Sequence, residues 1–573
     1  MIEIDAPEST SDYARDLARD AWPEMPDELL ERLRKVGEVV HKAEGDALFT
    51  FGEPGYDFFH ILSGRMGVID PTTEEVVMTA GAGNFAGELG MLMGQSAFMD
   101  GKMLEAGDIL RVPNRAFRDL LQTDPEISTL IIDAYTARRR LLVEWGEGGL
   151  ILIGTEDDPC LVNLLSYAER NQIPHRYICR SDTDALAELR KSCEIPSEGC
   201  VAVIGNAQVL ESPSPQDVAD AIGLDIKADS GRTFDVAIVG AGPGGLGAAV
   251  YAASEGLSTL IIEDTAIGGQ AGTSSRIENY LGFPAGISGA DLAYRAEVQA
   301  VKFGAYLTAP RRVVRCEKVD GMFRLELNSG ECFKACSVVL ANGVQYRRLP
   351  LDGLAEYEGR GVYYAATQLE ARFCRDTNAV IVGGGNSAGQ AAMFLSRSAD
   401  CTHMLVRSEG LAETMSSYLS DRVHSDDRIR LRTRSEVVGL HGKGRLEAVT
   451  IRDNATGEEE RVDTRALFIM IGAVPNTDWL PSELELDGKG FIRTGDDTDT
   501  ECGPYATSIE GLYAVGDVRS GSVKRVASAA GEGAVVVSFI HRYLEEHGVD
   551  TPVADQDDSS NSADVENADV AAE

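Results

Sequence analysis

A glycine-rich turn within residues 233–249 constrains the fold more than any other stretch of the chain. An apolar, β-branched run leads into Gly240-Ala-Gly242-Pro-Gly244-Gly245, and a run of small residues follows. We interpret these three parts as a strand, a phosphate-cradling turn and a helix. Gly240 permits the tight turn, Gly242 lets the backbone approach a pyrophosphate, and Gly245 lets the helix pack closely on the strand. The free N–H groups at the start of the helix suit an anion.

The residues after this turn support a dinucleotide site over an ordinary glycine turn in a sheet. Residues 259–262, Thr-Leu-Ile-Ile, are typical of the next strand, and Glu263 follows them, 18 residues after Gly245. A carboxylate at about this spacing grips a ribose hydroxyl in dinucleotide-binding folds. We therefore expect an α/β domain with a parallel sheet.

A second turn of the same kind occurs further along the chain. Ala379–Val382 indicates a strand, and it leads into the turn Gly383-Gly384-Gly385-Asn386-Ser387-Ala388. This Gly-x-Gly-x-x-Ala form is a tolerated variant of the motif. Arg407 follows the next predicted strand, where an arginine favours the 2′-phosphate of NADPH over NADH. Glu409 lies two positions later, so NADH stays possible.

Composition excludes several classes of protein. The chain of 573 residues is 43% hydrophobic, and none of its apolar runs reaches the ~20 residues of a membrane span. The formal charge of −39 repels nucleic acid and anionic membranes. A charge of this size is consistent with a protein from a salt-rich cytoplasm or with an ordinary acidic soluble protein. The first residues lack the pattern of a signal peptide, so we expect a cytoplasmic protein.

The cysteines and histidines give no sign of a metal site. The ten cysteines include no C-x-x-C, and the eight histidines are dispersed. This pattern fits neither a zinc ligand set nor a secreted disulfide framework. We expect no metal, and we interpret the cysteines as reduced structural thiols.

Residues 1–147 contain short strand-like runs broken by glycine, typical of a β-barrel or jelly roll, and then helical sequence. Phe85-Ala-Gly87-Glu88-Leu89 resembles the phosphate cassette of cyclic-nucleotide-binding domains. The resemblance implies that Glu88 bonds a ribose 2′-hydroxyl. The arginine that neutralises the cyclic phosphate in that family has no match in 94–100, and a buried phosphate without its cation is costly. We therefore favour a docking or regulatory role over nucleotide binding.

Residues 148–228 alternate predicted strands and helices and resemble a thioredoxin or glutaredoxin fold, with Val201–Ile204 expected to close the sheet. The resemblance places the active-site pair at Asp157 and Cys160, and the cis-proline position at Cys200. Dithiol exchange needs two sulfurs. We therefore expect a degenerate scaffold instead of a working redoxin.

The two glycine turns, with three further motifs, resemble the low-molecular-weight thioredoxin reductases over about residues 232–547. The further motifs are Gly268-Gly269-Gln270, Ile277-Glu278-Asn279-Tyr280 and Gly516-Asp517. The resemblance implies a homodimer with two Rossmann-like domains. FAD is expected in 232–348 and 478–547, and NAD(P)H in 349–477. Residues 552–573 are acidic and polar, and we expect them to be disordered.

The resemblance also assigns the cofactor contacts. For FAD these fall on the glycine turn and on Glu263, Gly269, Gln270, Asn279, Gly516, Asp517 and Ala527. For the nicotinamide coenzyme they are Gly383, Gly385, Asn386, Ser387, Ala388 and Arg407. No residue is nominated as catalytic acid or base; Glu370 and His403 are the nearest by position, although a surface carboxylate and a structural histidine are the simpler interpretations.

One departure from that family changes the expected chemistry. Thioredoxin reductases carry Cys-Ala-Thr-Cys where this chain has Ala365-Ala-Thr-Gln368. Hydride transfer to FAD is unaffected, because the cofactors carry it. We therefore expect an FAD-dependent NAD(P)H oxidoreductase that delivers electrons to a small redox protein or a small-molecule acceptor. A thioredoxin reductase that uses remote cysteines, such as Cys160, and a cofactor-binding sensor are the alternatives.

Overall fold

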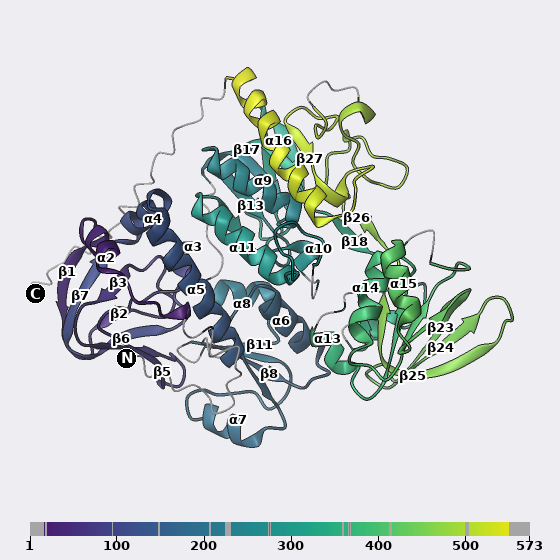
Figure 1. Ribbon diagram of the computed structural model, residues 1–573, viewed down its shortest axis with the longest axis horizontal. Helices are drawn as coiled ribbons and strands as arrows, with labels where there is room; N and C mark the ends of the chain where they lie inside the picture. Colours follow the sequence, from purple (N-terminus) through teal and green to yellow (C-terminus); the bar gives the residue numbers. More distant parts are fainter. Residues whose placement is uncertain are drawn as a thin grey trace, which may run out of the picture.

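The computed structural model describes residues 17, 20–93, 95–146, 149–205, 208–223, 231–272, 274, 277–357, 360–364, 366, 368–411, 415–498 and 503–548. Figure 1 shows four regions, which we name the β-roll domain (residues 20–146), the small α/β domain (149–223), the first Rossmann domain (231–343 and 478–548) and the second Rossmann domain (349–472). The tail expected to be disordered lies outside the described residues.

The β-roll domain is built from two antiparallel sheets. One has the order β1 (Glu38–Lys42), β7 (Gly107–Val112), β3 (Phe58–Ile61), and the other β2 (Ala47–Phe49), β6 (Asp100–Glu105), β4 (Arg65–Ile69), β5 (Val76–Gly81). The short strand-like runs that the sequence predicts are present as strands β1 to β5. Strands β6 and β7 were not predicted, because charged residues interrupt their alternation.

Helices complete this domain: α2 (Asp27–Arg34), α3 (Leu89–Met93), α4 (Asn114–Thr123) and α5 (Pro125–Trp145). The helical sequence predicted after the strands forms two helices. The backbone is extended at Asp124, where α4 ends, and α5 begins at Pro125. The Asp124 side chain accepts the N–H groups of Glu126 and Ile127, and Pro125 occupies the first helical position, where a missing N–H costs nothing.

The small α/β domain contains β8 (Leu150–Gly154), α6 (Pro159–Arg170), β9 (Arg176–Cys179), α7 (Thr183–Leu189), β10 (Val201–Ile204), β11 (Gln208–Glu211) and α8 (Pro215–Ala221). The sheet order is β11-β10-β8-β9, with β8 and β9 parallel and the other pairs antiparallel. The expectation that Val201–Ile204 closes the sheet is wrong, since β11 forms the edge beyond it. Only two apolar residues, Val209 and Leu210, mark β11 in the sequence, which is too weak a signal.

The first Rossmann domain has a seven-stranded sheet. Its order is β14 (Tyr306–Thr308), β13 (Thr259–Ile262), β12 (Thr233–Val239), β17 (Cys332–Leu340), β16 (Met322–Leu327), β15 (Val313–Val319), and β27 (Leu512–Ala514) also pairs with β17. Helices α9 (Pro243–Ser254), α10 (Gly269–Gly272), α11 (Gly289–Lys302) and α16 (Val526–Glu546) complete it. A Cβ on Gly533 would lie 2.1 Å from the carbonyl oxygen of Gly244, so glycine lets α9 and α16 meet backbone to backbone.

The second Rossmann domain repeats this topology. Its order is β22 (Ile429–Arg432), β21 (Thr402–Leu405), β20 (Asn378–Val382), β25 (Glu459–Ile469), β24 (Ala448–Asp453), β23 (Ser435–His441), with β19 (Val362–Tyr363) also on β25. Helices α12 (Leu354–Tyr357), α13 (Gln368–Phe373), α14 (Asn386–Leu395) and α15 (Ser417–Ser425) accompany it. The short pair β18 (Val344–Tyr346) and β26 (Ala473–Pro475) connects the two Rossmann domains. Both sheets agree with the predicted α/β class.

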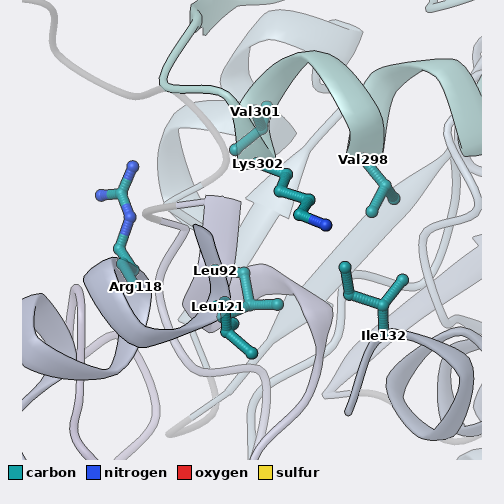
Figure 2. Close-up of a pocket in the computed structure, with 7 residues that line it drawn as sticks. All are labelled: Leu92, Arg118, Leu121, Ile132, Val298, Val301 and Lys302. Carbon is teal, nitrogen blue, oxygen red and sulfur yellow. The ribbon is translucent and has the colours of Figure 1, made fainter. Parts of the chain in front are cut away.

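The β-roll domain packs directly on the first Rossmann domain. Tyr294, Val298 and Val301 of α11 are part of the same buried apolar cluster as the interior of the roll. Figure 2 shows the small pocket at this boundary, where Leu92 and Ile132 of the roll lie opposite Val298. The two domains therefore share a hydrophobic core. Within the described parts of the chain, none of the helices is both long and apolar enough to span a membrane.

Candidate functional site

The first glycine turn leaves open space where a pyrophosphate would lie. A Cβ on Gly245 would lie 1.8 Å from the carbonyl oxygen of Gly240, and Gly240 itself has φ +102°. A Cβ on Gly242 would meet no protein atom within 4 Å, and Gly242 is the N-cap of α9. Glycine is thus needed at 240 and 245 for the turn, while Gly242 faces open space at a helix N-terminus, which suits an anion.

Glu263 follows β13 and lies beside this turn. Its carboxylate is buried and accepts the N–H groups of Ala241 (2.7 Å), Thr265 (3.0 Å) and Ala266 (3.2 Å). Burial raises the pKa of Glu263, and these N–H groups with the Arg170 guanidinium act in the opposite direction. A carboxylate offers about four acceptor positions, so one stays available for a ribose hydroxyl.

The next motif folds back onto the glycine turn. A Cβ on Gly269 would lie 3.1 Å from Cα of Gly242, so the two glycine segments are in contact. Gln270 donates from Nε2 to the carbonyl of Val344, at the connection between the Rossmann domains (2.8 Å). Asn279 lies exposed just after the buried Ile277. Three of the predicted segments thus converge at one end of the sheet, whereas the Asn279 side chain makes no hydrogen bond to the other described residues.

Gly516 and Asp517 lie in a short 3-10 turn after β27. Burial raises the pKa of the Asp517 carboxyl, and Lys524 opposes this. Ala527 is the second residue of α16 and is exposed. A residue that the sequence analysis missed positions this turn: Glu532, buried on α16, accepts the N–H of Gly516 (2.7 Å) and pairs with Arg519 (2.9 Å). Its place in the second turn of α16 gives no sign of this role in the sequence.

The first Rossmann domain therefore fits FAD. The test is the open volume beside Gly242, together with a carboxylate at Glu263 and another at Asp517. FAD needs hydrogen-bond acceptors for ribose and ribityl hydroxyls and N–H donors for its pyrophosphate. The first Rossmann domain supplies all three, with Glu263 bonded to the glycine turn and the segment before Asp517 beside Gly244.

The second glycine turn has the same local design. A Cβ on Gly383 would lie 2.2 Å from the carbonyl oxygen of Met470, so only glycine fits there. Gly385 is the N-cap of α14, Ser387 is exposed in its first turn, and Ala388 is buried at the strand contact. The Asn386 side chain accepts the N–H of Ser416 over 2.8 Å, which fixes the turn.

Arg407 is the exposed cation of the second site. Its side chain is 62% exposed, and its Nε lies 3.8 Å from Oε2 of Glu436. Glu409, the residue that left NADH possible, is paired with Arg434 over 2.6 Å. The carboxylate is thus already engaged by a cation, while the Arg407 guanidinium is accessible to a phosphate.

The two candidate acid–base residues differ in setting. His403 lies buried on β21, its Nδ1 accepts a hydrogen bond from Arg432, and burial lowers the pKa of its ring to about 4. It is therefore a neutral structural histidine at neutral pH. Glu370 lies on α13.

The segment that carries the redox cysteines in thioredoxin reductases leads into α13, which begins at Gln368. Residues 365 and 367 lie outside the described part of the chain. Cys374, the next cysteine along the chain, is fully buried, its Sγ lies 3.6 Å from the carbonyl of Glu370, and burial raises its pKa to about 12. All nine cysteines in the described residues are free thiols. The described structure thus contains no disulfide in this domain.

In the β-roll domain, the cassette carboxylate is occupied by an arginine of the same chain. Arg139 of α5 donates from Nε to Oε2 of Glu88 over 3.0 Å, and the N–H of Gly90 donates to Oε1 over 2.8 Å. Arg138 donates to the carbonyls of Ala21 and Gly87, and Arg140 pairs with Asp291 of α11 over 2.7 Å. The sequence showed three consecutive arginines but not that each has a different partner.

Comparison with known proteins gives two family matches. The pyridine nucleotide-disulphide oxidoreductase family matches residues 234–533, and the cyclic nucleotide-binding domain matches residues 39–124. The thioredoxin reductase of Treponema pallidum (strain Nichols) is 36% identical over 54% of this chain and 97% of its own length, and that of Mycolicibacterium smegmatis is 32% identical over 55% and 98%. The solved thioredoxin reductase of Lactococcus lactis is 28% identical, covers 55% of this chain and 99% of its own, and has a TM-score of 0.50.

Two dinucleotide turns on two linked Rossmann sheets define the class: an FAD-dependent NAD(P)H oxidoreductase. Within that class, the chain belongs to the pyridine nucleotide-disulphide oxidoreductase family and is a thioredoxin reductase-like flavoprotein. A cyclic nucleotide-binding domain precedes the catalytic half.

Proposed function

We propose that this protein oxidises NADPH and delivers the electrons to an acceptor that needs no disulfide next to the flavin. The observation that carries the proposal is Ala365-Ala-Thr-Gln368 in place of two cysteines, with the next cysteine along the chain, Cys374, buried in the core of the second Rossmann domain. Since thiol–disulfide exchange needs access for an attacking thiolate, Cys374 is a poor substitute.

The chain's own residues bind and orient the two dinucleotides. FAD, when bound, accepts a hydride from the reduced nicotinamide and passes electrons onward. The N–H groups at the start of α9 and the space beside Gly242 receive its pyrophosphate, and Glu263 accepts from its ribose. Asp517 receives a ribityl hydroxyl, and the N-terminus of α16 at Ala527 places positive potential near the ring. Gly385, Ser387 and Ala388 cradle the coenzyme phosphates.

NADPH is the preferred coenzyme in this proposal. The exposed Arg407 offers a charge-assisted hydrogen bond to the 2′-phosphate. Glu409 would serve a free ribose hydroxyl in NADH, but its pairing with Arg434 weakens that alternative.

The two front domains are proposed to dock and not to catalyse flavin chemistry. The Arg139–Glu88 pair supports this for the β-roll domain, because an arginine of the same chain occupies the carboxylate that would bind a nucleotide ribose. The strand order β11-β10-β8-β9, with β8 and β9 parallel and the other pairs antiparallel, supports the thioredoxin-like interpretation of the small α/β domain.

The acceptor is proposed to be a small redox protein or a small molecule such as a quinone, and the protein is proposed to be a cytoplasmic homodimer. The relatives of Treponema pallidum and Mycolicibacterium smegmatis are thioredoxin reductases. The nine free thiols of the described residues suit a reducing compartment.

An anaerobic titration tests the proposal. The purified protein is expected to be yellow and to lose its visible flavin absorption on addition of NADPH, at lower concentrations than with NADH. Quinone or oxygen should restore the colour, and added thioredoxin should then gain no thiols. Fast thioredoxin reduction would support the remote-cysteine alternative, and a flavin that NADPH does not bleach would support a sensor.

A further inference from the structure

Three cysteines of the small α/β domain lie at the same end of three neighbouring strands, β9, β8 and β10, close to the start of a helix. In the sheet register, Cys179 pairs with Gly154, the last residue of β8. Val201 pairs with Ile153 on the other side of β8, so Cys200, the residue before β10, lies next to Gly154 as well. Cys160 is the second residue of α6, the helix that follows β8. Thiols far apart in sequence are thus brought to one edge of the domain.

Cys160 and Cys200 lie close together in the interior of the domain. Cys160 packs against the buried apolar cluster that contains Cys200, and each thiol affects the pKa of the other. Cys160 is partly buried, whereas Cys200 is buried at 2% exposure. The Cys160 Sγ also lies 3.5 Å from the carbonyl of Pro213, just before α8. The pair therefore combines one accessible sulfur and one protected sulfur.

We propose that Cys160 and Cys200 form a redox-active dithiol that reduces disulfide substrates by closing an intramolecular disulfide. The site is outside both Rossmann domains, and the chemistry does not depend on the flavin. It also replaces the Asp157/Cys160 arrangement expected from the thioredoxin-like sequence, because the partner sulfur comes from the residue before β10 and not from the loop before α6.

The exchange balances with a disulfide R–S–S–R as the oxidant. The Cys160 thiolate attacks one sulfur and the S–S bond of the substrate breaks. The leaving thiolate RS⁻ takes up the proton that Cys160 lost and becomes RSH. Cys200 then loses its proton and attacks the Cys160 sulfur, which closes the Cys160–Cys200 disulfide and releases the second RSH. The pair loses two electrons and two protons, and the substrate becomes two thiols.

The surroundings assign the roles of the two sulfurs. Burial raises the pKa of both thiols, and more strongly for Cys200. Cys200 acts to lower the pKa of Cys160, while Asp158 at the helix N-cap acts to raise it. Cys160 is therefore the attacking thiol and Cys200 the resolving thiol. The rate of exchange should rise with pH through the alkaline range, since the thiolate is the nucleophile.

The test uses the reduced full-length holoprotein, with NADPH left out so that flavin turnover cannot contribute. Oxidised glutathione is added, free thiols are alkylated, and peptides are mapped by mass spectrometry. The expected product is a Cys160–Cys200 cross-linked peptide that forms faster at higher pH. Cys200→Ser should instead accumulate glutathione on Cys160. Cys193→Ser is the matched control: it removes a half-buried thiol of the same domain, whose Sγ contacts the carbonyl of Leu189, and should cross-link like the native protein.

Two results would overturn the proposal. One is an unmodified pair while other cysteines, such as Cys179, take up glutathione. The other is equal accumulation of glutathione on Cys160 in the native protein and in Cys200→Ser, which would show that Cys200 does not resolve. Neither result depends on whether the flavin accepts electrons from NADPH, so failure here is distinguishable from failure of the proposed reductase activity.

Discussion

Arg139 and Glu88 form an ion pair that is nearly sealed from solvent, with side chains 3% and 12% exposed. The carboxylate that would bind a cyclic nucleotide's ribose thus binds a guanidinium from α5. Glu88→Ala is expected to destabilise the β-roll domain by about 3–5 kcal/mol, because it leaves Arg139 buried without a partner. Thermal and denaturant unfolding measure this.

Glu105→Ala is the control for that substitution, since the Arg65–Glu105 pair is exposed and should contribute at most about 1 kcal/mol. Cyclic AMP is expected to leave the melting temperature of the native protein unchanged. A clear rise in melting temperature with cyclic AMP would contradict the interpretation that Arg139 occupies the nucleotide-binding carboxylate of the cassette.

Glu297 on α11 gives a pH dependence at the same boundary. It is buried beside Arg139, with Tyr294 close by, and burial raises the pKa of its carboxyl to about 7 from a usual 4.5. The folded protein therefore holds a proton that the unfolded chain releases. The contribution of Glu297 to the free energy of unfolding is fully present below pH ~4.5 and is lost as the pH rises through about 7.

The substitution Glu297→Gln keeps the shape of the side chain but removes the group that ionises. The difference in unfolding free energy between the variant and the native protein should therefore shift in favour of the variant from pH 5 to pH 8. Comparison of the two proteins cancels the titration of the other carboxylates. A difference that stays flat across this range would show that Glu297 titrates normally.

The fold was predictable where a local motif dictates it. The glycine turns specify strand, turn and helix within about fifteen residues, and both lie where predicted. Strands β6, β7 and β11 were missed because sheet neighbours, and not their own alternation, stabilise them. The partners of Glu88, Gly516 and Cys160 were also missed, since each is distant in sequence: Arg139, Glu532 and Cys200. The local sequence pattern thus predicts the glycine turns, whereas the side-chain partners around each site depend on tertiary packing.

Gly242→Ala tests the FAD site without disturbing the fold. A Cβ there meets no protein atom, and φ −72° is ordinary for alanine, so the variant should fold normally. The methyl group would enter the space for the pyrophosphate, at a cost of about 1–3 kcal/mol, or roughly tenfold to a hundredfold in FAD affinity. Reconstitution of the apoprotein, followed by flavin fluorescence, measures this. Gly245→Ala should instead fail to form the turn, because its Cβ would collide with the Gly240 carbonyl.

Arg407→Gln tests the choice of coenzyme. Loss of the charge is expected to weaken NADPH binding about tenfold or more and to leave NADH binding nearly unchanged, because only NADPH carries the 2′-phosphate. Flavin reduction at increasing concentrations of each coenzyme reports both affinities. Arg397→Gln, at an exposed position after α14, is the matched control. Equal losses for both coenzymes would place Arg407 elsewhere than at the 2′-phosphate.

Arg170 links the small α/β domain to the FAD site. It is the last residue of α6, its Nη2 lies 3.5 Å from the carbonyl of Gly269, and its buried Nε makes no hydrogen bond within the described structure. The guanidinium also acts to lower the pKa of Glu263. A cation at this place should attract the pyrophosphate. Arg170→Gln is therefore expected to weaken FAD binding about tenfold in the reconstitution assay, and to lose part of this effect at high salt.

Arg176→Gln removes an exposed cation from β9 of the same domain and should bind FAD like the native protein. The two variants have the same net charge, so any difference between them reflects position. If both retain FAD equally, Arg170 serves only the packing between domains, and the melting temperature of the apoprotein would then fall in Arg170→Gln alone. Loss of FAD without a change in that melting temperature would instead show that the fused domain supplies part of the flavin site.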